Sequence, residues 1–101
     1  MKAVVLYDID TSRIDQIPLH IAAHRGWWQE FANRGELLMV GPFANVHDGA
    51  MGVFTTRAAA EAFVRGDPFV LTGIVQTHTI RDWHEALIPD RPRPPSSGLP
   101  T

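Results

Sequence analysis

The spacing of apolar residues changes along the chain in an order that few folds can accommodate. Spacing typical of strands occurs in residues 3–9, 36–43, 50–55 and 74–83, and spacing typical of helices in residues 18–34 and 57–65. The predicted order is therefore strand, helix, strand, strand, helix, strand. This order is typical of an α+β domain with the ferredoxin-like plan, in which four antiparallel strands form one sheet and both helices cover one of its faces.

Proline and glycine mark the predicted helix ends. Pro18 suits the first turn of a helix, where its missing N–H group costs nothing, and Gly35 suits the position just after the last turn. Gly66 ends the second helix in the same way. Asp67 and Pro68 follow at once, and this pair is typical of the start of a short helical turn, because Asp caps the first N–H groups and Pro tolerates the first position.

The composition excludes several classes of protein. The chain has 101 residues and no cysteine, so it has neither a disulfide framework nor a thiolate metal site. Nine basic and eleven acidic residues leave a net charge of −2, which provides no electrostatic surface for nucleic acid. No apolar run approaches the ~18 residues of a membrane span, and the first apolar stretch is too short for a secretory signal. We therefore expect a cytoplasmic protein without nucleic-acid or membrane partners.

The composition changes abruptly near the C-terminus. Five prolines occur in the last fourteen residues, 88–101, together with serine and glycine. Such a segment buries too little apolar surface to offset the entropy lost on ordering. We therefore predict one folded domain, residues 1–88, followed by a disordered proline-rich tail, residues 89–101.

The first strand is apolar on both faces. It places Val4 and Leu6 on one face and four further apolar residues on the other. Two helices cover only one face of such a sheet, and the opposite face of an antiparallel sheet is normally polar. An uncovered apolar face would exceed the patch that monomers usually tolerate, so we expect a homodimer in which two sheets face each other.

The first helix carries a histidine on its apolar face. At 100° per residue, His24 lies within the stripe formed by Ile21, Trp28 and Phe31, whereas Arg25 points away from it. A core histidine bonded to a backbone carbonyl explains this position, and so does a general base or ligand at the floor of a cleft. His20 lies one turn earlier at the edge of the stripe, a spacing that suits a metal pair, but no third ligand is evident and no metal is expected.

Asp67 is the natural partner for such an imidazole, although its position before Pro68 explains it equally well as a helix cap. The sequence alone does not bring Asp67 and His24 together. Among the other histidines, His78 alternates with Ile74 and Ile80 and is expected on the uncovered face of the sheet.

Four short motifs, taken in order, resemble the YCII-related (YciI-like) domain family across nearly all of residues 1–84. They are His24, Gly35–Leu38 (GELL), Gly41-Pro42-Phe43, and Asp67-Pro68-Phe69-Val70 followed by Gly73. The resemblance implies a ferredoxin-like fold that dimerises as an α+β barrel. It also implies that His24 and Asp67 form a catalytic dyad.

The resemblance further implies a small cofactor-independent enzyme of lyase or isomerase type. His24 and Asp67 would perform acid–base chemistry on a small phenolic, enolic or lactone-like substrate. The expected substrate-binding residues are His20, Trp28, Gly41, Pro42, Phe43 and Phe69. Many family members carry an arginine about three residues before the histidine, where this chain has Ile21. The alternative is a non-catalytic module for small-molecule binding or dimerisation, in which the same two residues serve structure.

Overall fold

The computed structural model describes residues 1–87, so Ile88 and the predicted tail, residues 89–101, lie outside the described part. The elements are β1 (Lys2–Ile9), η1 (Thr11–Gln16), α1 (Ile17–Asn33), β2 (Leu37–Pro42), η2 (Val46–Asp48), β3 (Ala50–Phe54), α2 (Arg57–Gly66), α3 (Pro68–Leu71) and β4 (Val75–Trp83), where η marks a 3-10 helix. No helix within this part is long and apolar enough to span a membrane.

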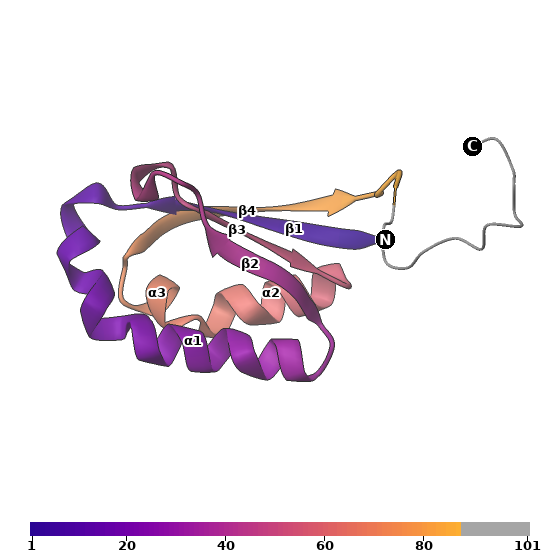
Figure 1. The fold of residues 1–101 in the computed structure, drawn as a ribbon, viewed down its shortest axis with the longest axis horizontal. Helices are drawn as coiled ribbons and strands as arrows, with labels where there is room; N and C mark the ends of the chain where they lie inside the picture. The colour runs from indigo at the N-terminus through magenta and orange to yellow at the C-terminus, as the bar shows by residue number, and fades with distance from the viewer. Residues whose placement is uncertain (88–101) are drawn as a thin grey trace, which may run out of the picture.

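The four strands form one antiparallel sheet in the order β2-β3-β1-β4, and the helices lie on one of its faces (Figure 1). The first and last strands of the chain therefore lie next to each other, while the β2–β3 hairpin extends the sheet on the other side. This arrangement confirms the predicted ferredoxin-like α+β fold.

A cluster of three phenylalanines holds the helices on the sheet. Phe31 of α1 and Phe63 of α2 meet edge to face with ring centroids 5.3 Å apart, and Phe54 of β3 lies 5.0 Å from Phe63. All three side chains are buried. Aromatic rings bury large apolar areas and prefer such tilted contacts, so this cluster fixes both long helices against the same strands.

The opposite face of the sheet has no helix above it. The strand register places Val4 beside Val53, and Leu6 beside Met51, on this face. Met39 joins them from the edge strand β2 and is 62% exposed. An apolar strip therefore crosses β2, β3 and β1, as the two-faced pattern of the first strand indicates.

His78 does not lie on this uncovered face, so that prediction is wrong. It pairs with Tyr7, and its neighbour Ile80 pairs with Val5, on the face that the helices cover. His78 is nevertheless exposed, because β4 is an edge strand. His78 and Ile80 share one face of the sheet, as their alternation predicts, but this is the face beneath the helices, where Ile80 packs against the core.

Candidate active site

Asp67 occupies the short junction between α2 and α3. It is fully buried, and its Oδ1 accepts a hydrogen bond from the backbone N–H of Phe69 at 3.0 Å. The residue is thus the N-cap of α3, with Pro68 at the first helical position, as Asp-Pro chemistry favours. The cap uses only part of the carboxylate, which leaves further hydrogen-bonding capacity inside the protein.

Helix α1 lies directly against this junction. The indole N–H of Trp27 donates a hydrogen bond of 2.9 Å to the backbone carbonyl of Phe63. The Trp27 ring also covers Gly66, where a Cβ atom would overlap it, so only glycine permits this approach. Because His24 lies one turn before Trp27 on α1, the same contact brings its imidazole to Asp67.

The imidazole of His24 is held by a hydrogen bond and a stacked ring. Its Nδ1 lies 2.7 Å from Oδ1 of Asp67, and its ring stacks on Phe69 with centroids 3.9 Å apart and planes 7° from parallel. A carboxylate accepts hydrogen bonds, so Nδ1 carries the proton and donates it to this bond. Nε2 is then a bare acceptor, and no residue within 1–87 forms a hydrogen bond with it.

Tyr7 completes the surroundings of the carboxylate. Its hydroxyl donates a hydrogen bond of 2.8 Å to Oδ2 of Asp67. Burial, and then the negative charge of Asp67, raise the pKa of Tyr7 far above its ordinary value of 10.0, so the hydroxyl remains a protonated donor. Asp67 therefore accepts hydrogen bonds from Tyr7, His24 and the Phe69 backbone, which satisfies a charge that is buried at high cost.

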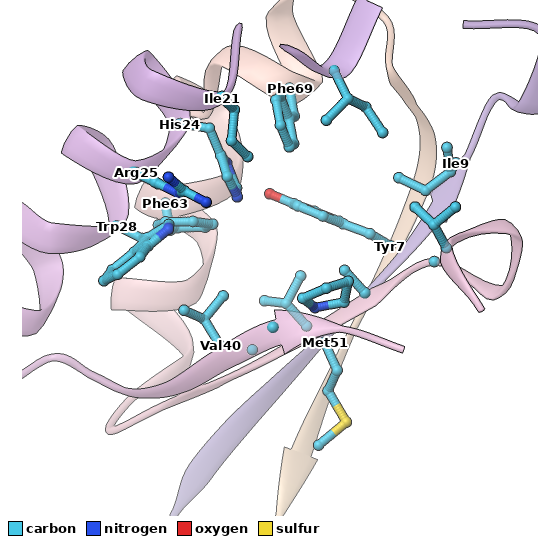
Figure 2. A pocket seen from close by; sticks show the side chains of 18 of the residues that line it. Tyr7, Ile9, Ile21, His24, Arg25, Trp28, Val40, Met51, Phe63 and Phe69 are labelled. Atoms are coloured by element: carbon cyan, nitrogen blue, oxygen red, sulfur yellow. The ribbon is translucent and has the colours of Figure 1, made fainter. Parts of the chain in front are cut away.

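A cavity of about 340 Å³ opens beside this network, between α1 and the sheet. Three positions of β3 face the helices, Ala50, Gly52 and Phe54, and the first two carry no large side chain that would fill this space. Figure 2 shows the Tyr7 hydroxyl and the His24 ring directed into the cavity, with Met51 pointing away from it. The lining is almost entirely apolar, which suits a small organic molecule with few polar groups.

Four of the six expected substrate-binding residues line this cavity: Trp28, Gly41, Pro42 and Phe69. The lining residues do not include His20, which is half-buried on α1, or Phe43, which is 38% exposed beyond the end of β2. Within the described part of the chain, no group of three or more His, Cys, Asp or Glu residues is arranged to hold a metal ion.

Two polar lining residues, Arg25 and Tyr7, were not expected at the site from the sequence. Arg25, placed on the outer side of the first helix by its angle, reaches the cavity because its side chain is long and flexible (Figure 2). Tyr7 is one of the four apolar residues that the sequence places on the second face of the first strand. A buried tyrosine hydroxyl usually needs a hydrogen-bond partner, and this requirement was the available signal.

The family follows from comparison with known proteins. The model of the YCII-related domain matches residues 1–84. This chain belongs to the YCII-related domain family. The resemblance seen in the four motifs is therefore confirmed. No curated protein matches this YCII-related domain significantly.

A solved structure shares the fold of this YCII-related domain. It is 5-chloro-2-hydroxyhydroquinone dehydrochlorinase from Burkholderia phenoliruptrix in complex with 2,5-dihydroxybenzoquinone, with a TM-score of 0.70 and 16% sequence identity. The match covers 85% of this chain and 96% of the dehydrochlorinase. At this level of identity the likeness shows that the two proteins share the fold.

Proposed function

We propose that this YCII-related domain is a small enzyme in which His24 transfers a proton of a bound organic substrate and Asp67 orients the imidazole. The observation that carries this proposal is the 2.7 Å contact between Nδ1 of His24 and Oδ1 of Asp67 at the wall of a 340 Å³ cavity. A bond to Nδ1 directs Nε2 at the reacting molecule, as a general base requires.

The proposed step needs only groups of this chain. Nε2 of His24 accepts a proton from a C–H or O–H group of the substrate, and the bonding electron pair stays on the substrate as an enolate or phenolate. The resulting imidazolium is stabilised by the Asp67 carboxylate and returns the proton to another atom of the same molecule. Tyr7 holds the other carboxylate oxygen and so keeps Asp67 in position.

The apolar lining and the size of the cavity favour a compact ring-shaped substrate, of phenolic, enolic or lactone-like chemistry. The complex of the dehydrochlorinase with a dihydroxybenzoquinone agrees with a substrate of this class. The second candidate is a non-catalytic binding module. The observation that favours it is that Asp67 is also a helix cap, since its Oδ1 accepts the Phe69 N–H group.

Proton exchange on 2,5-dihydroxybenzoquinone in D₂O separates these candidates. We expect the protein to accelerate the loss of the ring-proton NMR signal and the variant His24→Gln to reduce this acceleration by about 10²–10⁴-fold. His78→Gln is the matched control, because His78 is exposed on β4 and does not line the cavity. Exchange at the uncatalysed rate with the unaltered protein, or equal rates in both variants, would favour the binding module.

We also propose that the uncovered face of the sheet joins two copies in a homodimer. The accessible apolar residues of the strip, Val4, Leu6, Met39 and Met51, support this assembly, since sheets pack face to face at about 10 Å. Val53 between them is already buried in the single chain. Sedimentation should show a dimer at micromolar concentration that Met39→Glu weakens. Leu19→Glu on the exposed side of α1 should leave it intact. A monomer for the unaltered chain would contradict this assembly.

A further inference from the structure

Arg25 has no role in the hydrogen-bond network around Asp67. It follows His24 on α1, is exposed, and lines the cavity (Figure 2). No carboxylate or other acceptor within residues 1–87 pairs with its guanidinium. Four other cations of this part do have carboxylate partners, namely Lys2, Arg13, Arg34 and Arg57.

Arg25 is also the one permanent charge among the residues that line the cavity. The hydroxyl of Tyr7 stays protonated, and the charge of Asp67 lies behind the lining, bonded to Tyr7 and His24. Arg25 is exposed to solvent on one side, while the apolar wall of the cavity reduces the screening of its charge on the other. Its unpaired guanidinium therefore attracts an anion bound in the cavity more strongly than an anion in bulk water.

We propose that Arg25 binds the anionic group of the ligand, so that the substrates of this site are small unsaturated or aromatic rings bearing a carboxylate or an enolate. This inference rests on the proposed function, because it assigns the substrate class of the same cavity. The planar guanidinium offers two parallel N–H donors to such a group. Apolar side chains on either side of Arg25, including Ile21 and Trp28, would receive the ring itself.

A matched pair of probes tests the charge requirement. Benzoate and benzamide have the same ring and nearly the same shape, but only benzoate is charged. We expect benzoate to bind about tenfold more tightly than benzamide, as measured by NMR titration, and Arg25→Gln to remove this preference by weakening benzoate alone. Raising the salt concentration should weaken benzoate and leave benzamide unchanged.

Arg65→Gln is the matched control, because Arg65 is an exposed arginine in the last turn of α2 that does not line the cavity. It should leave both affinities unchanged. Equal binding of the two probes to the unaltered protein, binding of neither, or equal losses in both variants would overturn the assignment.

The variant His24→Gln distinguishes this inference from the proposed chemistry. If Arg25 selects anions, the preference for benzoate persists in His24→Gln, because the guanidinium is untouched. If only the acid–base proposal fails, proton exchange is unaffected by His24→Gln while the benzoate preference still depends on Arg25. If only the anion site is wrong, exchange depends on His24 and the two probes bind alike.

Discussion

The hydroxyl of Tyr7 donates a 2.8 Å hydrogen bond to Oδ2 of Asp67, although the two residues are 60 positions apart in the chain. The bond joins the first strand to the junction of α2 and α3, and it is buried. His24 uses the other oxygen of the same carboxylate. The two oxygens of Asp67 are thus held from the sheet on one side and from α1 on the other.

Tyr7→Phe should destabilise the protein by about 1–3 kcal/mol, because it leaves Oδ2 of a buried carboxylate without its donor. Chemical denaturation measures this loss. Thr77→Val is a suitable control, since the Thr77 hydroxyl donates to Asp8 at the same 2.8 Å but on the exposed surface, and its removal should cost much less. Equal losses of unfolding free energy in the two variants would show that the buried Tyr7–Asp67 bond stabilises the protein no more than the exposed Thr77–Asp8 bond does.

Alkaline pH should reduce stability through Tyr7, which is the one tyrosine of the chain. The unfolded chain releases the phenolic proton near pH 10, whereas burial and Asp67 raise the pKa of Tyr7 far above that value in the folded state. Unfolding above pH 10 therefore releases a proton, so the free energy of unfolding falls as pH rises. In Tyr7→Phe the free energy of unfolding should therefore fall less steeply with pH above pH 10.

Ultraviolet absorbance measures directly whether Tyr7 keeps its phenolic proton in the folded protein. No tyrosinate signal should appear near pH 10 while circular dichroism reports a folded protein. A tyrosinate signal in the folded state at that pH would contradict the protonated donor inferred from the structure.

Asp67→Asn should reduce proton exchange by about 10–100-fold, because the amide keeps an oxygen for the Phe69 cap but no longer offers His24 a charge. Asp67→Ala should in addition cost about 1 kcal/mol of stability through the lost cap. An unchanged exchange rate in Asp67→Asn would leave Asp67 with a structural role alone.

Ala50→Leu should abolish benzoate binding, because the longer side chain would extend from β3 into the cavity. Its melting temperature should stay the same or rise, as expected when an existing void is filled with apolar atoms. Ala23→Leu, on the exposed side of α1, adds the same atoms outside the cavity and should leave binding intact. Benzoate binding that survives Ala50→Leu would place the ligand elsewhere.

Gly66→Ala should destabilise the protein by about 1–3 kcal/mol and change the Trp fluorescence, because the added methyl group overlaps the Trp27 ring. Gly26→Ala on α1 is the matched control. A Cβ atom at Gly26 meets nothing within 4 Å, so alanine there should stabilise the helix by up to about 1 kcal/mol. Similar effects of both substitutions would argue against close packing of α1 on the junction.

Local patterns predicted the fold because each element carries its own signal. The periods of the apolar residues mark the strands and helices, and Asp67 with Pro68 marks the start of α3. The sequence could not predict that His24 lies next to Asp67, since this distance depends on how Trp27 packs against Gly66 between two helices. Such a contact has no local signature in either segment.

The position of Arg25 was misjudged for a related reason. A helical angle describes where the Cα–Cβ bond points, and it neglects the reach of the flexible arginine side chain, whose three methylene groups carry the guanidinium away from that direction. For short side chains such as Ile21 the angle is a good guide, and this residue lines the cavity as its place on the apolar stripe suggests. Phe43 lies outside the lining because β2 ends at Pro42, one residue earlier.

The cavity owes its depth to Ala50 and Gly52 of β3, whereas the hydrogen-bond network comes from β1, α1 and the junction before α3. Substitutions on β3 can therefore remodel the floor without breaking a bond to Asp67. The hydrogen-bond network, in contrast, joins β1 and α1 to the junction before α3, so substituting Tyr7, His24 or Asp67 removes at least one of its hydrogen bonds. A change at Ala50 or Gly52 would therefore alter which molecules fit into the cavity and leave the arrangement of Tyr7, His24 and Asp67 as it is.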